Sequence, residues 1–346
     1  MPGVRRDVLL HRAAGHHLGT RTDLRTAVAA IGLRDVQGWG VVMAHARAHA
    51  VTIDSLDAAR AGGELADVVG PRGAGLTVPT ADIDVFTIGS LPADEGSLRT
   101  RLRNLLPVLD AAGHTATSAL DAAREIAMET LAAGPVDIGT LSGALTRGLP
   151  ALSPLCPGRC TVAHISQTLF DLVGESGVWV HDDLGDRRLY VPYTPTMARE
   201  DARAELARRF AACHGPTPTA ERFAQYCGIS TKDAATSVVS VETVTAPVTG
   251  IRLLPPRDPY LIDRDREVLV PDVDARRRIY TPTPTDGVVL VDGEPVASWR
   301  ARKGARSTYE MRIQPFAPLT HDDALQAECD AVAALRRCER AEVTVG

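Results

Sequence analysis

The sequence predicts an α+β fold that is mainly helical and consists of three tandem winged-helix modules. Three stretches of the chain each run from helical patterns to strand patterns, and helices followed by a β-hairpin are the elements of a winged helix in order. The chain has 346 residues, of which 45% are hydrophobic and 23% charged, a composition typical of folded domains. We expect the modules to cover residues 1–115, 116–200 and 201–346.

The first module is predicted to be dominated by helices. Helical patterns cover residues 5–17, 23–31 and 36–49. A glycine-rich stretch at 70–75 interrupts the chain, and a further helix is expected to begin near Thr80, where the residues resemble a helix cap.

The second module has the clearest winged-helix pattern. Helices are predicted over residues 119–132, 137–146 and 161–173, the third from apolar residues at helical spacing. Strands are predicted at 177–181 and 188–191, with an acidic, glycine-containing turn between them.

The third module repeats this order. Its Asp292-Gly293 turn is a strong hairpin signal. The predicted elements are helices at 201–214, 220–226 and 230–239, strands at 240–244, 287–292 and 295–302, and a final amphipathic helix at 321–339.

The overall charge gives no support to a large nucleic-acid surface. The formal net charge is -5, whereas nucleic-acid binding usually goes with a basic balance, so any DNA site has to be local. No apolar run reaches the roughly 20 residues of a membrane helix, and no signal peptide is recognisable. We therefore expect a cytoplasmic protein with no membrane partner. Rossmann and P-loop glycine patterns are absent from the sequence, which predicts no nucleotide cofactor.

The six cysteines do not suggest a disulfide framework, because the chain has no secretory signal. Cys156, Cys160 and His164 have a spacing that would place three zinc ligands on one helical face. Pro157 and Gly158 interrupt that helix, and a fourth ligand is not obvious nearby. We expect no metal ion.

Four segments carry motifs that occur together in one protein family. They are Leu206-Ala207-Arg208-Arg209-Phe210 with Gly215-Pro216-Thr217-Pro218; Arg252-Leu253-Leu254-Pro255-Pro256-Arg257-Asp258-Pro259-Tyr260-Leu261; Val289-Leu290-Val291-Asp292-Gly293 with Trp299-Arg300-Ala301-Arg302-Lys303 and Pro315-Phe316-Ala317-Pro318-Leu319; and Pro71-Arg72-Gly73-Ala74. Together they resemble the AlkZ-like family of winged-helix DNA glycosylases.

The resemblance implies three tandem winged-helix modules that form a concave DNA-binding surface. It also implies a monofunctional DNA glycosylase that acts on bulky or cationic alkylated purines, as N7-guanine or N3-adenine adducts in double-stranded DNA. Such enzymes often protect an organism from its own DNA-alkylating natural product. We expect a monomer that needs no cofactor.

Such a reaction requires few catalytic groups from the protein. Alkylation at N7 or N3 makes the base cationic, so it leaves without prior protonation. The enzyme has to stabilise an oxocarbenium-like sugar and orient a water molecule, for which a carboxylate or amide pair is sufficient. The lesion must also be exposed to the enzyme.

The family places this polar pair after a Gly-Leu in the first module. Here that stretch is Gly32-Leu33-Arg34-Asp35-Val36-Gln37. One register gives Asp35-Val36-Gln37, and the other gives Arg34-Asp35-Val36, which lacks the pair. We prefer the first, in which Asp35 polarises the water, Gln37 holds the water or the sugar, and alternation places both on one side. The alternative is that Asp35 caps a helix and Gln37 is a solvated first-turn residue.

The candidate DNA contacts are basic. Arg300, Arg302, Lys303 and Arg306 surround the turn at Gly304, from where they would grip phosphates, although a solvated hairpin tip has the same composition.

Arg34, beside the candidate catalytic pair, and Arg72, in the Pro-Arg-Gly-Ala turn, complete the candidate DNA contacts. Asp258 matches a family loop near the DNA-facing cleft, but an Asx-type turn before Pro259 explains it equally well.

Two other functions compete with glycosylase activity. A non-enzymatic winged-helix protein, either a regulator or a lesion-shielding protein, would use the same fold without the chemistry. A cytosolic hydrolase would use a Cys-His pair at Cys160 and His164.

Overall fold

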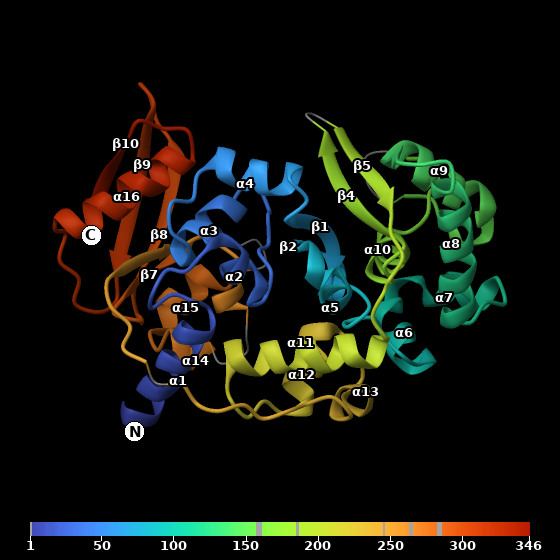
Figure 1. The fold of residues 1–346 in the computed structure, drawn as a ribbon, viewed down its shortest axis with the longest axis horizontal. Coiled ribbons are helices and arrows are strands. Elements are labelled where there is room, and N and C mark those ends of the chain that lie inside the picture. The colour runs from blue at the N-terminus through green and yellow to red at the C-terminus, as the bar shows by residue number, and fades with distance from the viewer. Residues whose placement is uncertain (1, 157–160, 185–186, 245, 263–265, 282–285) are drawn as a thin grey trace. The chain divides into compact units, whose positions relative to one another are not determined.

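The computed structural model describes residues 2–156, 161–184, 187–244, 246–262, 266–281 and 286–346. Helices take up 48% of the chain and strands 19%, so the fold is α+β and mainly helical, as the sequence predicts (Figure 1). Among the described residues, none of the helices combines the length and the apolar character needed to cross a membrane.

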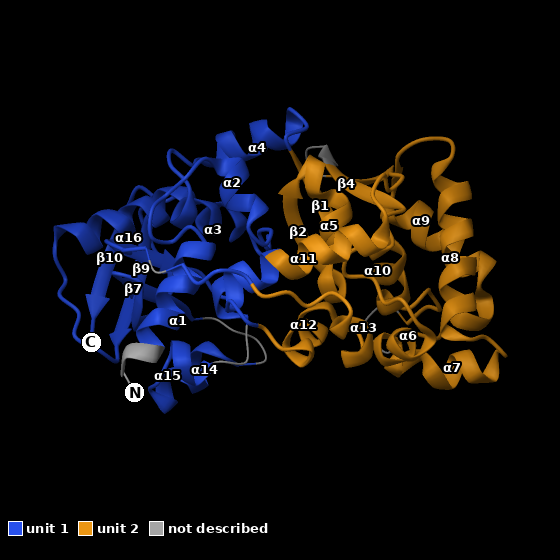
Figure 2. Ribbon diagram, turned by 60° about the horizontal axis from the view of Figure 1, so that its bottom comes forward, with its two compact units in different colours: residues 1–64, 209–217, 241–346 blue, residues 65–208, 218–240 orange. Residues whose placement is uncertain are grey.

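The chain forms two compact units (Figure 2). The first unit comprises residues 1–64, 209–217 and 241–346, and the second comprises 65–208 and 218–240. These units are not the modules expected from the sequence, and the module boundaries stay a prediction.

The first unit contains one antiparallel sheet with a parallel strand added at its edge. Its helices are α1 (Pro2–Gly15), α2 (Leu24–Ala29), α3 (Gly40–Arg47), α4 (Ile53–Ala61), α14 (Arg266–Leu269), α15 (Val273–Ile279) and α16 (Asp323–Leu335). Its strands are β6 (Ile251–Leu254), β7 (Gly287–Val291), β8 (Glu294–Lys303), β9 (Thr308–Pro315) and β10 (Arg340–Val345). Helix α11 (Arg199–His214) contributes residues to both units.

The sheet of the first unit has the order β10-β9-β8-β7-β6. Strands β7 and β8 meet at the predicted Asp292-Gly293 turn, where both residues have positive φ angles of 50° and 80°. Helix α16 connects β9 to the parallel strand β10. Helices α3 and α16 both contact β6 and also contact each other, so the C-terminal helix lies beside the helix that follows the candidate catalytic residues.

A buried ion pair holds the core of this unit together. Arg47, at the end of α3, donates to both carboxylate oxygens of Asp258, at 2.9 and 2.5 Å. The two side chains are 1% and 0% exposed. Asp258 also accepts a hydrogen bond from the Tyr260 N–H at 2.9 Å, which is the Asx-type turn that the sequence offered as an alternative. A side chain so completely buried cannot face DNA.

The second unit combines two β-hairpins in one sheet. Its helices are α5 (Ile83–Phe86), α6 (Glu95–Arg101), α7 (Leu106–Ala111), α8 (Ala116–Leu131), α9 (Ile138–Gly148), α10 (Gln167–Glu175), α12 (Ala220–Cys227) and α13 (Thr231–Ala235). Its strands are β1 (Leu65–Gly70), β2 (Ala74–Pro79), β3 (Val136–Asp137), β4 (Trp179–Leu184) and β5 (Arg187–Pro192). The order is β2-β1-β4-β5-β3, and the two hairpins join where Asp67 pairs with His181.

The core of the second unit lies between α10 and the β4–β5 hairpin. Trp179 is fully buried, and its ring is 5.1 Å from that of Phe170 and 5.5 Å from that of Tyr190. The two predicted strands at this place are therefore confirmed, and their apolar residues face the helix that precedes them. The turn predicted at 182–186 differs, because β4 continues through Leu184, and residues 185–186 lie outside the described residues.

Several elements differ from the sequence predictions. The hairpin β1–β2 was not predicted, because the glycine-rich stretch at 70–75 was interpreted only as an interruption. The helix predicted over 161–173 begins at Gln167, since Ser166 accepts a hydrogen bond from the Leu169 N–H and caps it. Residues 240–244 form no strand, and β6 pairs with β7 instead.

Candidate functional site

The candidate catalytic residues lie in the loop between α2 and α3. A helix was predicted over 36–49, but α3 begins only at Gly40. The reason is local: Gln37 and Gly38 have φ angles of 59° and 71°, and a right-handed helix cannot include such residues. The loop therefore presents Asp35 and Gln37 outside any helix.

Asp35 has a partner on each carboxylate oxygen. Oδ1 accepts a hydrogen bond from the Gly40 N–H at 3.0 Å, and Oδ2 lies 3.2 Å from Nη2 of Arg60 on α4. A side chain at position 40 would meet Cγ of Asp35 at 2.8 Å, so glycine is required there for this approach.

Through the first of these bonds Asp35 satisfies the first N–H of α3 from five residues before Gly40, but it is not the N-cap residue of the sequence-based alternative. The residue in the N-cap position itself, Trp39, makes no capping bond with its side chain. A carboxylate has about four acceptor positions, and the side chain of Asp35 is 31% exposed. Capping therefore leaves Asp35 able to accept a further hydrogen bond.

Gln37 occupies a different position on the loop. Its side chain is exposed, and this side chain makes no hydrogen bond with the part of the chain that the structure describes. The alternation argument assumed an extended backbone, which the left-handed Gln37 does not have. Alternation therefore does not place Asp35 and Gln37 on one side, and their pairing stays a prediction.

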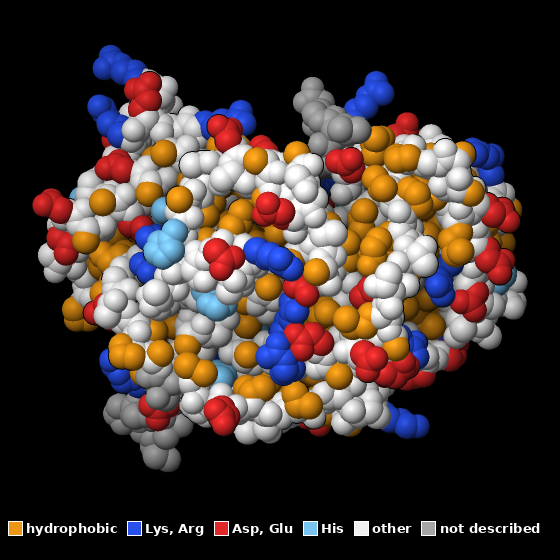
Figure 3. Space-filling model, in the orientation of Figure 1, with side chains coloured by type: hydrophobic (Ala, Val, Ile, Leu, Met, Phe, Trp, Pro, Cys, Tyr) orange, Lys and Arg blue, Asp and Glu red, His pale blue; other side chains and the backbone are white. Residues whose placement is uncertain are grey.

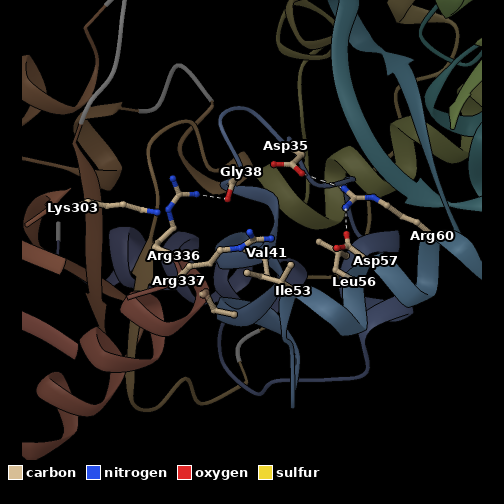
Figure 4. A pocket seen from close by; sticks show the side chains of 11 residues that line it. Asp35, Gly38, Val41, Ile53, Leu56, Asp57, Arg60, Lys303, Arg336 and Arg337 are labelled. Atoms are coloured by element: carbon tan, nitrogen blue, oxygen red, sulfur yellow. Dashed lines mark hydrogen bonds and ion pairs between the residues drawn. The ribbon is translucent and has the colours of Figure 1, made fainter. Parts of the chain in front are cut away.

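A pocket of about 270 Å³ lies beside Asp35, entirely within the first unit (Figure 4). Its apolar lining is Val41, Ile53, Leu56 and Leu335, and its charged lining is Asp35, Asp57, Arg60, Lys303, Arg336 and Arg337. The charged lining thus combines four basic groups with two carboxylates.

Arg60 is the link between the two carboxylates of the pocket. It lies 3.2 Å from Asp35 and 3.4 Å from Asp57, and Figure 4 shows its guanidinium between them. The sequence analysis did not identify Arg60, because an arginine at the end of a short amphipathic helix has no distinctive sequence signal.

The predicted basic cluster at the β8–β9 turn is exposed. Arg300, Arg302 and Lys303 lie on β8 and Arg306 in the turn, where its φ angle is 54°. Figure 3 shows Lys and Arg side chains gathered at the end of the sheet where this turn lies. Arg302 pairs with Glu310 at 2.7 Å while staying 81% exposed, and Lys303 also lines the pocket.

Arg34 and Arg72 belong to different compact units. Arg34 is half-buried in the loop of the first unit, whereas Arg72 belongs to the second unit, in the turn of the β1–β2 hairpin with a φ angle of 60°. The Arg72 backbone N–H hydrogen-bonds Glu175, which also pairs with Arg101 at 2.5 Å. Burial raises the pKa of Glu175 despite these contacts.

The cysteine residues were considered above as zinc ligands and as part of a Cys-His pair. Cys160 lies outside them, and they contain no group of three His, Cys, Asp or Glu side chains that could hold a metal ion. Burial raises the pKa of Cys329 to about 12, so this thiol is protonated at neutral pH and is a poor nucleophile.

A family model described as DNA glycosylase AlkZ-like matches residues 28–340. The structure is similar to that of the Streptomyces sahachiroi DNA glycosylase AlkZ, with a TM-score of 0.76 and 19% sequence identity over 99% of each chain. At this level of identity, the structural similarity shows a shared fold alone. No curated protein matches this chain.

Proposed function

The chain belongs to the AlkZ-like family of DNA glycosylases, and from this premise we propose that it hydrolyses the N-glycosidic bond of bulky or cationic alkylated purines in double-stranded DNA. The substrates are N7-guanine and N3-adenine adducts, because their positive charge makes the base a good leaving group. The enzyme is monofunctional: water attacks the anomeric carbon of the sugar, and the alkylated base leaves.

The observation that carries this proposal is the environment of Asp35. Its carboxylate lies at a pocket lined by both apolar and charged side chains, where Arg60 and the Gly40 N–H hold it while 31% of the side chain stays exposed. A carboxylate fixed in this way stabilises the oxocarbenium-like sugar and accepts a proton from the attacking water. The Gln37 amide, which is exposed on the same loop, holds that water or the sugar.

The proposed DNA contacts are the exposed cations of the β8–β9 turn, Arg300, Arg302, Lys303 and Arg306, together with Arg34 and Arg72. The pairing of Arg302 with Glu310 is a surface ion pair of small energy, so phosphate can compete for the guanidinium. Because each phosphate contact releases counterions, binding weakens as salt rises. A local cluster of this kind reconciles DNA binding with a net charge of -5.

The wider biological setting is also part of the proposal. The protein acts as a cytoplasmic monomer in self-resistance to a DNA-alkylating natural product. Its chain is organised as three winged-helix modules with boundaries near residues 115 and 200, and together they form the DNA-binding surface.

The direct test is incubation of the protein with a duplex that carries a single N7-alkylguanine, followed by alkaline cleavage. We expect strand breaks at the lesion and none in the unmodified duplex. Tight binding without abasic sites would instead identify a non-enzymatic DNA-binding protein, a regulator or a lesion-shielding protein. Protein pretreated with a thiol-alkylating reagent should keep its activity. Loss of activity after this treatment would favour the Cys-His hydrolase.

A further inference from the structure

Arg336 contacts three consecutive residues of the loop that carries Asp35. It is the first residue after α16, and its Nη1 donates hydrogen bonds to the carbonyl oxygens of Gln37, at 3.1 Å, and Gly38, at 2.6 Å. Its guanidinium carbon lies 4.4 Å from the centre of the Trp39 ring, a cation–π distance. Figure 4 shows Arg336 reaching the pocket opposite Arg60, with Gly38 and Asp35 between them.

The loop needs such a support because of its backbone conformation. Gln37 and Gly38 both have left-handed φ angles, which a residue with a side chain adopts only at an energetic cost. Conformations of this kind persist where the surrounding structure fixes them. The two carbonyl oxygens held by Arg336 belong to these two residues, so its hydrogen bonds act on the turn itself.

Arg336 is itself held in place. Its guanidinium charge opposes the burial that raises the pKa of Tyr309 on β9. Helix α16, which ends just before Arg336, is held through Glu328. This side chain accepts two hydrogen bonds of 2.9 Å from Arg21 and lies 3.6 Å from His45, which is near the end of α3. The C-terminal helix therefore contacts α3 near its end and, through Arg336, the loop before its start.

We propose that Arg336 is a positioning residue for the glycosylase reaction: it fixes the Gln37–Gly38 turn so that the Gln37 amide and the Asp35 carboxylate address the same substrate. This inference rests on the proposed function. Arg60 holds the carboxylate of Asp35 directly, whereas Arg336 acts only through the backbone two and three residues later. Removal of Arg336 leaves Asp35 in place and releases the turn.

The test compares Arg336→Ala with Arg336→Lys and with Arg340→Ala. Arg340→Ala is a matched control, because this substitution removes the same charge from a nearby exposed position. Arg340 pairs there only weakly with Glu342. At saturating enzyme, we expect Arg336→Ala to slow excision of an N7-alkylguanine by about 10- to 100-fold, the range that a misplaced group produces. Arg336→Lys should retain part of the rate, and Arg340→Ala all of it.

Two readouts separate positioning from DNA contact. If Arg336 acts on the loop, the dissociation constant for lesion DNA and its salt dependence stay unchanged in Arg336→Ala. A phosphate contact would instead lower the slope of log K against log salt by about 0.9, and that result would overturn the proposal. Millimolar guanidinium should restore part of the rate of Arg336→Ala and none of that of Asp35→Asn.

Amide hydrogen exchange of the loop tests the inference without any substrate. Exchange of residues 35–40 should be faster in Arg336→Ala than in the wild type and unchanged in Arg340→Ala. Equal exchange in all three proteins would overturn the positioning role even if excision occurs. If exchange is faster in Arg336→Ala but the wild-type protein excises nothing, the proposed function is overturned and only the support of the loop remains.

Discussion

Two arginine–aspartate pairs of the first unit differ in how far they are open to solvent. Arg47 and Asp258 are 1% and 0% exposed and lie 2.5 Å apart at their closest atoms. Arg60 and Asp35 are 22% and 31% exposed and lie 3.2 Å apart. The buried pair joins α3 to a loop in the core, whereas the exposed pair presents a carboxylate to a pocket. Exposure, and not residue type, decides which pair is open to a substrate.

The largest effect on stability is expected at the buried pair. Arg47→Met leaves the Asp258 carboxylate buried without its partner, and breaking such a pair costs about 3–5 kcal/mol of the free energy of unfolding. Urea unfolding followed by circular dichroism measures this loss.

The control is the double variant Arg47→Met with Asp258→Leu, which removes both charges. We expect it to recover much of the lost stability, because an apolar replacement of the whole pair is often neutral. A single variant as stable as the wild type would mean that Asp258 is not buried as described.

At the exposed pair we expect a small effect on stability and a larger effect on the excision rate. Arg60→Ala should change the free energy of unfolding by less than about 1 kcal/mol, because a solvent-exposed ion pair contributes little. Its excision rate should fall by about tenfold, since Asp35 then keeps only the Gly40 N–H as a partner among the described residues. Thermal melting and single-turnover excision measure the two quantities. A large loss of stability with a normal excision rate would reverse the roles of the two pairs.

The smallest effect concerns pH and the contact between α16 and α3. Burial alone would raise the pKa of Glu328, but the hydrogen bond to His45 and the charge of Arg21 outweigh burial and lower it below 4.5. The unfolded chain therefore binds more protons just below pH 4.5, and stability rises with pH there. Glu328 contributes stability above that pH and loses it as pH falls through the lowered pKa.

Glu328→Gln should therefore reduce the free energy of unfolding by about 1 kcal/mol at pH 7 and by less at pH 3. Urea midpoints at the two pH values measure the difference. An equal loss at both values would show that the charge of Glu328 is not what holds α16.

Local signals predicted much of the fold. The Asp292-Gly293 turn and the hairpin after α10 were predicted because turn residues and strand alternation act between neighbours in the chain. The β1–β2 hairpin was missed, since its turn residues Arg72 and Gly73 resemble any glycine-rich interruption. Strand β10 was missed because its partner β9 is parallel and lies across a helix, a pairing that no local pattern reveals.

The candidate site was predicted only in part. Asp35 and Gln37 were selected through a family resemblance, and the sequence could not reveal that Gln37 is left-handed. Arg336 was missed because it looks like an ordinary basic residue at a helix end, and its partners Gln37 and Gly38 lie 299 and 298 residues away. The Asx-type turn at Asp258 was correctly offered from the sequence. The burial of Asp258 against Arg47 could not be predicted, because the two residues are 211 positions apart.

The most direct test of the account is the excision rate of Asp35→Asn relative to the wild type, measured at saturating enzyme on a duplex with one N7-alkylguanine. General base catalysis typically contributes a factor of about 10²–10⁴. We therefore predict a rate at least about 100-fold lower, with unchanged affinity for the lesion and a similar loss in Gln37→Ala. Full activity in both variants would contradict the assignment of the chemistry to this loop.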